Sequence, residues 1–300
     1  MHLAIDARGI RKRFGRTDVL AGLDLAVRAG TIFALLGPNG SGKTTTINIL
    51  TTLVQPDEGS VLVAGHDVAT APEEVKRRIS LTGQAAAVDE VLSGAENLVM
   101  FGRLSGLSTR DARRRADELL LRFDLAEAGS RRVGTYSGGM RRRLDLALSL
   151  VVEVPVIFLD EPTTGLDTRS RQELWRVIRS LADGGATVFL TTQYLEEADL
   201  LADRIAVLDH GRIVAEGTAD ELKALVGGEV VELRDGEGVL LVELPTDGSV
   251  HGLRRAVEEI DRQAAAGTDG ATVSIRRPSL DDVFLQITGR DVAPELQESR

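Results

Sequence analysis

The chain has 300 residues, of which 43% are hydrophobic and 27% are charged, and it contains no cysteine. This composition is typical of a globular protein, and the missing cysteines exclude disulfides, thiolate zinc sites and a cysteine nucleophile. The formal net charge of −10 opposes general binding to nucleic acid phosphates. No apolar run approaches the ~18 residues that a membrane span needs, and the N-terminus lacks the apolar segment of a secretory signal. We therefore expect a main domain, followed by a smaller one.

Short apolar strands alternate with helical patterns and Gly-rich turns from residue 31 to about residue 216. The strand candidates lie at 31–37, 59–65, 154–160, 186–192 and 204–209. Near-continuous apolar strands of this kind are typical of a buried, mostly parallel sheet with helices on both faces. The first part of the chain, up to about residue 30, and the strand at 59–65 predict an antiparallel flank instead.

The pattern turns helical between about residues 85 and 150. The segment 108–125 places Ala, Leu and Phe on one face and Arg and Asp on the other, which predicts an amphipathic helix. We interpret this region as a helical subdomain inserted into the α/β core. The three predicted parts of the chain are a main domain at 1–224, a small α+β domain at 225–289 that follows a linker, and a disordered tail at 290–300.

A phosphate-binding loop is predicted at 37–45, where GPNGSGKTT follows a strand and opens a helix. Gly37, Gly40 and Gly42 allow the backbone to turn its N–H groups inward, as an anion site requires. Lys43 supplies a compact charge for the β- and γ-phosphates of ATP, and Thr44 supplies a hydroxyl for Mg²⁺. Only four of the 36 basic residues are lysines, so a lysine here fits the need for a small ammonium. We expect every residue of this loop to contact ATP: Gly37, Pro38, Asn39, Gly40, Ser41, Gly42, Lys43, Thr44 and Thr45. The alternative is an ordinary Gly-rich turn that binds no nucleotide.

Two carboxylates follow the apolar strand VIFLD, at Asp160 and Glu161. The ends of strands in open α/β sheets are where ligands bind. Asp160 is expected to hold Mg²⁺ through water, and Glu161 to accept a proton from the attacking water or to orient that water. The alternative is a solvated turn.

A second loop, YSGGM at 136–140, precedes a predicted helix. Ser137, Gly138 and Gly139 again offer backbone N–H groups at a helix N-terminus, where a phosphate can bind. Together with the preceding motifs, this loop resembles the signature loop LSGGQ of the ATP-binding cassette (ABC) family. The resemblance implies a P-loop α/β core, in which this loop contacts the ATP that a second copy of the chain holds. The active unit would then be a homodimer with two ATP molecules between its subunits.

The same resemblance assigns further residues. Gln84 matches the glutamine that joins the core to the helical subdomain and reaches Mg²⁺ and the attacking water. Asp167, in GLD, matches the loop that crosses the dimer interface. Phe14 matches the aromatic residue that stacks on adenine, since stacking needs only a flat apolar face; the alternative is that Phe14 belongs to the core.

Gln193 occupies the position at which the family normally has a histidine, the switch residue near the γ-phosphate. An amide offers two N–H donors and one acceptor, but unlike histidine it gains no charge near neutral pH. Our hypothesis is that Gln193 senses the γ-phosphate by hydrogen bonding while Glu161 remains the base, so that turnover is slow but real. The alternative is a degenerate site that binds ATP without hydrolysing it.

The segments 80–104, 136–150 and 191–209 resemble the ATPase subunits of daunorubicin-type drug-resistance exporters, as does the segment 276–290 near the C-terminus. The resemblance implies a subunit at the cytoplasmic face of the cell membrane that drives a separate integral-membrane permease and exports a hydrophobic compound. It implies no nucleic acid partner. The alternatives are an ABC ATPase that works on ribosomes or in DNA repair, and a regulatory subunit with little turnover.

Three consecutive arginines, 141–143, follow the signature loop. A phosphate contact is conceivable for Arg141 or Arg143, but a solvated helix face is the favoured interpretation. Trp175 is interpreted as packing within an amphipathic helix. The small C-terminal domain shows no chemistry in its sequence.

Overall fold

The computed structural model describes residues 2–83, 88–263 and 270–289. The chain divides into two compact units, residues 1–216 and 217–300. The sequence predicted the boundary between the two parts slightly later, at a linker that follows residue 224. The helix α8 (Ala219–Ala224) nevertheless belongs to the second unit, because it packs on α10 (Leu280–Thr288) of that unit. Gln84 and the predicted tail 290–300 lie outside the described residues.

The first unit is built on a six-stranded sheet in the order β10-β9-β3-β8-β7-β6. The neighbours from β9 to β6 all pair in parallel. The six strands are β3 (Ile32–Leu36), β6 (Ile79–Thr82), β7 (Val156–Asp160), β8 (Thr187–Thr192), β9 (Arg204–Asp209) and β10 (Arg212–Gly217). The predicted parallel α/β core is thus confirmed, and the central strands β3, β7 and β8 are buried along their whole length.

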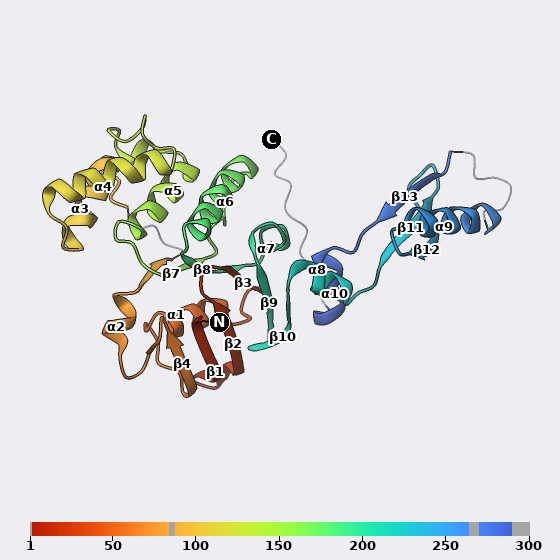
Figure 1. Ribbon diagram of the computed structural model, residues 1–300, viewed down its shortest axis with the longest axis horizontal. Coiled ribbons are helices and arrows are strands. Elements are labelled where there is room, and N and C mark those ends of the chain that lie inside the picture. Colours follow the sequence, from red (N-terminus) through yellow and green to blue (C-terminus); the bar gives the residue numbers. More distant parts are fainter. Residues whose placement is uncertain (1, 84–87, 264–269, 290–300) are drawn as a thin grey trace. The chain divides into compact units, whose positions relative to one another are not determined.

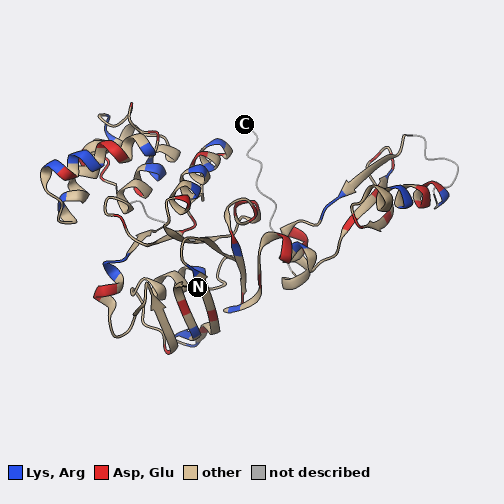
Figure 2. Cartoon of the chain, in the orientation of Figure 1, with Lys and Arg blue, Asp and Glu red and all other residues tan. Residues whose placement is uncertain are grey.

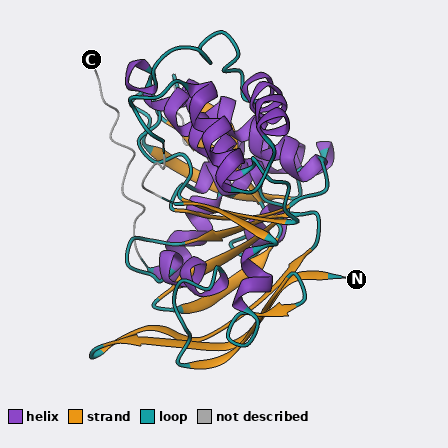
Figure 3. Ribbon diagram, turned by 90° about the vertical axis from the view of Figure 1, so that its left-hand side faces the viewer, coloured by secondary structure: helices purple, strands orange, loops and turns teal. Residues whose placement is uncertain are grey.

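A second, antiparallel sheet flanks the first in the order β2-β1-β4-β5. Its strands are β1 (Leu3–Phe14), β2 (Thr17–Arg28), β4 (Glu58–Val63) and β5 (His66–Asp67). Figure 3 shows its long strands at the bottom of the view, below the central sheet. The antiparallel flank that the sequence predicted is therefore confirmed.

The main core fills the space between the two sheets, around α1 (Lys43–Leu50). Successive side chains of a strand point to opposite faces, and Phe33, Phe158 and Phe189 all belong to this core. The ring of Phe189 stacks on Phe33, with centroids 5.6 Å apart, and lies 5.7 Å from the ring of Phe158. These three rings join β3, β8 and β7 in the core, two or three residues before the strand ends where ligands are expected.

Three helices pack against the opposite side of the central strands: α5 (Gly138–Ser149), α6 (Thr168–Asp183) and α7 (Leu195–Leu201). Together with α1 they place helices on both faces of the sheet, as Figure 1 shows. Between β6 and β7 lies the inserted helical region with α3 (Gly94–Leu104) and α4 (Thr109–Arg122), and α2 (Pro72–Lys76) precedes β6. Arginines are distributed along α4, α5 and α6 (Figure 2).

Side-chain caps fix the ends of the inserted helices. Ser93 and Glu96 form a reciprocal capping box at the start of α3, which satisfies backbone donors that the helix itself leaves free. Ser108 caps α4 through the backbone N–H of Asp111. Beyond α4, the buried Tyr136 hydroxyl donates to the carbonyl of Ala128 at 2.7 Å and so fixes the first residue of the signature loop.

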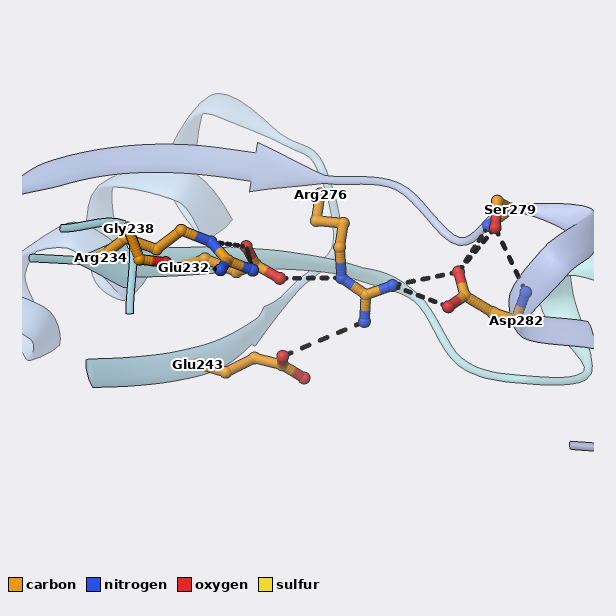
Figure 4. Close-up of polar contacts among 7 residues, drawn as sticks. All are labelled: Glu232, Arg234, Gly238, Glu243, Arg276, Ser279 and Asp282. Carbon is orange, nitrogen blue, oxygen red and sulfur yellow. Dashed lines mark hydrogen bonds and ion pairs between the residues drawn. The ribbon is translucent and has the colours of Figure 1, made fainter. Parts of the chain in front are cut away.

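The second unit contains a three-stranded antiparallel sheet in the order β12-β11-β13, with α9 (Val250–Gln263) packed on one face. Its strands are β11 (Glu229–Arg234), β12 (Leu240–Thr246) and β13 (Thr272–Arg276). Figure 4 shows a polar network that begins at the buried Glu232. Arg276 donates to Glu232 at 2.8 Å and to Asp282, at the start of α10, at 3.0 Å. The predicted α+β character of this region is confirmed.

We expect Phe189→Ala to destabilise the first unit by about 3–5 kcal/mol, because it removes a fully buried ring and leaves a cavity between two others. Urea unfolding followed by the fluorescence of Trp175, the only tryptophan in the chain, measures the change. The control is Leu104→Ala, at a side chain that is 78% exposed. Equal midpoints for the two variants would contradict the proposed role of the ring cluster.

Candidate functional site

The predicted phosphate loop lies between the end of β3 and the start of α1. Gly40 and Gly42 adopt φ angles of 80° and 114°, which favour glycine. At Gly37 and Gly42 there is also no room for a side chain: a Cβ would collide with the Leu208 carbonyl at Gly37 and would lie 2.8 Å from Leu20 at Gly42. The loop is therefore held in one tight conformation by its surroundings.

Lys43 directs its ammonium group back into this loop. Its side chain is almost completely buried, with 3% of it exposed, and Nζ donates to the carbonyls of Gly37 at 2.7 Å and Pro38 at 3.1 Å. The same Nζ lies 3.2 Å from Oε1 of Glu161. A buried ammonium is costly unless it is paired and hydrogen-bonded, so these contacts fix both the lysine and the loop around it.

The loop fits a polyphosphate. The Ser41 hydroxyl is buried and has no hydrogen-bond partner among the described residues, although buried polar groups normally have one. The loop also leads into the N-terminus of α1, where backbone N–H groups favour an anion. A phosphate group can be bound by a free hydroxyl, a buried ammonium and a helix N-terminus, and all three occur together in this loop.

Asp160 ends β7 beside the phosphate loop. Its Oδ1 accepts a hydrogen bond from Thr191 at 2.6 Å and lies 3.5 Å from the Thr44 hydroxyl. A carboxylate and a hydroxyl are oxygen ligands of the kind that Mg²⁺ prefers. Among the residues that the structure describes, no group of three or more His, Cys, Asp or Glu side chains is arranged to hold a metal ion by itself.

Glu161 follows with a strained backbone: its φ of 47° lies in the left-handed region that non-glycine residues rarely adopt. Such a conformation costs of order 1–3 kcal/mol and persists only where the surroundings hold it. The backbone N–H of Glu161 donates to the Thr191 carbonyl at 3.2 Å and to the Thr191 hydroxyl at 3.1 Å. This neighbouring strand thus fixes the position of the candidate base.

Gln193 directly follows β8, and its side chain is half-buried. β8 pairs in parallel with both β3 and β7, so the three strands end at the same edge of the sheet. The Gly37 N–H donates to the Thr192 carbonyl at 3.2 Å, which joins the phosphate loop to the residue before Gln193. Lys43, Glu161 and Gln193 are therefore gathered at one edge.

The signature residues lie at the start of a different helix. Ser137 is the N-cap of α5 and accepts from the N–H of Met140, while Asp167 is the N-cap of α6 and accepts from the N–H of Ser170. Gly139 packs so closely on Ser170 that a Cβ there would collide with its hydroxyl. The contact between Gly139 and Ser170 therefore brings the two helix starts together, while the capping bonds of Ser137 and Asp167 stay within their own helices.

Phe14 lies at the end of β1 with 51% of its surface exposed, so it is not part of the core. The ammonium of Lys12 lies 5.4 Å from its ring centroid. An exposed ring of this kind is available to stack on a planar ligand.

Arg142, the middle arginine of the run, has a role that the sequence did not predict. Arg141 pairs with Glu90 at 3.0 Å and Arg143 with Asp124 at 3.3 Å. Arg142 instead points to the strand ends and donates to three backbone carbonyls. Successive side chains on a helix point in directions about 100° apart, so the three arginines of the run must face different neighbours. This spacing was the signal that could have separated Arg142 from Arg141 and Arg143.

A buried carboxyl, Glu197 on α7, was also missed. It is fully buried and accepts a hydrogen bond from the indole N–H of Trp175 on α6 at 3.0 Å. Burial raises the pKa of Glu197, although hydrogen bonds from Thr192, Trp175 and Thr163 oppose the rise. Trp175 therefore packs as predicted and, in addition, ties α6 to the helix that follows Gln193.

A family model described as ABC transporter matches residues 20–164. The chain is 52% identical to the daunorubicin resistance ATP-binding protein DrrA3 of Streptomyces coeruleorubidus, over 96% of both chains. The chain belongs to the ABC transporter family, in the daunorubicin/doxorubicin resistance subfamily. It is an ABC ATPase that binds ATP and couples its hydrolysis to transport, as the signature loop predicted.

Two further relatives place this member within the family. The Nod factor export ATP-binding protein I of Rhizobium sp. (strain N33) is 38% identical over 97% of this chain and 98% of its own. A solved structure of the ATP-binding cassette MJ0796, described as dimeric, post-hydrolysis and bound to ADP and Pi, is 25% identical. Its TM-score is 0.64, over 71% of this chain and 98% of that chain. The predicted ABC fold is confirmed.

The raised pKa of Glu197 predicts a pH-dependent stability difference between this chain and Glu197→Gln. The folded wild type holds the carboxyl proton more strongly than the unfolded chain, so its stability falls as the pH rises through the raised pKa. Glutamine keeps a hydrogen-bond acceptor for Trp175 but has no proton to lose. We therefore expect the melting temperature of Glu197→Gln, minus that of the wild type, to increase between about pH 5 and about pH 8.

Circular dichroism at both pH values measures the two melting temperatures. Arg171 and Arg142 also face Glu197, and they remain charged throughout this range. Glu196→Gln, at an exposed neighbour, is the control. A difference for Glu197→Gln that does not change with pH would contradict the raised pKa.

Proposed function

We propose that this chain energises the export of a hydrophobic small molecule, of the daunorubicin type, through a separate integral-membrane permease. The observation that supports this most strongly is the 52% identity to a daunorubicin resistance ATP-binding protein over nearly the whole chain. The relative named for Nod factor export supports the outward direction. Among the described residues, no helix is both long and apolar enough to cross a membrane. We propose that the chain works at the cytoplasmic face of the membrane, bound to the permease and to no nucleic acid.

ATP is proposed to lie over the phosphate loop, with its adenine on Phe14. The loop N–H groups and Lys43 hold the β- and γ-phosphates. Thr44, Asp160 and Gln84 would hold Mg²⁺, which when bound neutralises phosphate charge. The buried Ser41 hydroxyl supports this placement, because it gains a partner in a phosphate oxygen.

Hydrolysis is proposed to depend on Glu161 and Gln193, which flank the γ-phosphate from two neighbouring strands. Glu161 orients the attacking water and accepts its proton, while its fixed backbone determines where the carboxylate lies. The Gln193 amide donates to a γ-phosphate oxygen and cannot take up a proton. Gln84 would help to position the water.

A second copy of the chain is proposed to complete each site. Ser137, Gly138 and Gly139 offer the N-terminus of α5 to the ATP that the partner holds, and Asp167 approaches the partner across the interface. Local capping already satisfies both Ser137 and Asp167, so their helix starts are pre-formed for this contact. Closure on ATP and opening after hydrolysis would then move the permease, because ATP contacts both subunits only in the closed dimer.

Replacing Glu161 with glutamine tests the proposed function. The variant keeps the shape of the side chain but removes the base, so we expect ATP hydrolysis to fall by at least about 100-fold while ATP binding is retained. The variant should form a stable dimer with Mg·ATP, measured by light scattering in the presence of its permease. Cells that express the permease with the wild type should accumulate less daunorubicin than cells that express it with Glu161→Gln. Equal accumulation would contradict export, and a monomer with ATP bound would contradict the shared site.

Replacing Gln193 with alanine tests the switch residue. A hydrogen bond to a charged group contributes about 1.5–3 kcal/mol, so its loss in the transition state should reduce kcat by about 10- to 100-fold with little change in ATP affinity. Gln193→His is the matched variant, and it should retain or increase turnover because histidine can also donate to a phosphate. Unchanged steady-state hydrolysis in Gln193→Ala would show that the side chain has no part in the mechanism.

A further inference from the structure

We propose that Arg142 is a positioning residue that couples the signature helix α5 to Glu161, so that ATP bound at the start of α5 controls the geometry of the other site. The inference rests on the proposed two-chain site. Arg142 touches neither nucleotide in this scheme. It acts through the backbone on either side of the base.

The guanidinium of Arg142 holds three carbonyls at once. Nε donates to Pro162 at 2.8 Å, Nη1 donates to Gly83 at 2.8 Å, and Nη2 donates to Asp160 at 3.3 Å. Nη1 also pairs with the buried Asp145, one turn further along α5, at 3.2 Å. Every nitrogen of the side chain is used, and only 12% of the side chain is exposed.

Two of these carbonyls belong to the residues immediately before and after Glu161. The left-handed backbone of Glu161 must be held by its surroundings. Thr191 holds its N–H group from the neighbouring strand, and Arg142 of α5 holds the carbonyls of Asp160 and Pro162. The orientation of the Glu161 carboxylate therefore depends on where α5 places Arg142.

The third carbonyl belongs to Gly83, which directly follows β6. The same guanidinium thus joins the ends of β6 and β7, two neighbouring parallel strands, to α5. A displacement of α5 would act on both strand ends together.

The position of Arg142 within α5 favours this coupling. It lies five residues after the N-cap Ser137, about 7.5 Å further along the same helix. Arg141 and Arg143 on the same helix pair with Glu90 and Asp124 in the inserted helical region. The helix therefore joins the signature loop, the insertion and the base, and Arg142 alone of the three arginines reaches the strand ends.

Arginine is the side chain that this arrangement requires. Its planar fork presents donors in several fixed directions, whereas lysine presents a single point charge. Burial lowers the pKa of Arg142, and the carboxylates of Asp145, Asp160 and Glu197 oppose this effect. A buried charge of this kind is weak evidence for stability alone, which fits a positional role.

The test compares Arg142→Lys with Arg141→Lys in the full-length chain with its permease. Arg142→Lys keeps the charge but retains at most part of the carbonyl contacts. We expect its kcat for ATP to fall by at least about 10-fold, since several charge-assisted hydrogen bonds are lost, while its Kd for Mg·ATP stays within about threefold. The Hill coefficient for ATP should fall towards one. Arg141→Lys, which can still pair with Glu90, should retain the wild-type values.

Each result decides the question. Arg142→Lys with unchanged kcat and Hill coefficient would overturn the proposal. If that variant fails to fold, Arg142→Gln takes its place; failure of both to fold would also overturn it, because the residue would then be a structural requirement. Loss of ATP affinity in parallel with kcat would likewise indicate a general structural role. A wild type without ATP hydrolysis would overturn the proposed function itself, whereas an active wild type with an unaffected Arg142→Lys would overturn only the coupling.

Discussion

The burial of the Lys43 ammonium is the constraint on which the site depends. A charge in the interior must be surrounded by acceptors, and here two loop carbonyls and Glu161 provide them. Because those acceptors come from the phosphate loop and from the end of β7, the lysine fixes the distance between two motifs that are far apart in the sequence. Because there is no room for a side chain at Gly37 or Gly42, the surrounding residues also restrict the path of the loop backbone.

The backbone of Glu161 is likewise an energetically unfavourable feature that several neighbouring residues hold in place. Its left-handed backbone would relax in isolation, but Thr191 holds its N–H and Arg142 holds the adjacent carbonyls. Strain at a reacting group, held by its surroundings, is a common feature of functional sites. In this chain the surroundings include α5, the helix that begins with the signature loop, because its Arg142 donates to the carbonyls on either side of Glu161.

The helix α6 plays a corresponding part on the other side of the site. Near its start, Gly139 of α5 packs on Ser170, and Arg171 lies over the ring of Tyr194 with its guanidinium carbon 4.9 Å from the centroid. One turn later Trp175 bonds Glu197 on α7. The signature loop and the segment that follows Gln193 therefore both pack against α6, the helix that Asp167 caps, so their relative positions are set together.

The sequence alone determined the parallel core, the phosphate loop, the Asp-Glu pair and the family, because each is a local pattern: an apolar strand, then residues whose chemistry depends on short spacing. The sequence predicted ligand binding at the ends of the strands, and the structure shows that β3, β7 and β8 end at the same edge of the sheet. Arg142 and Glu197 escaped prediction since their partners, Gly83 and Pro162 for the one and Trp175 for the other, lie many residues away in the chain. A hydrogen bond between distant segments produces no periodic pattern in a sequence. Only the tertiary structure, in which α5, α6 and α7 pack against the strands, determines which buried charged side chains support the site.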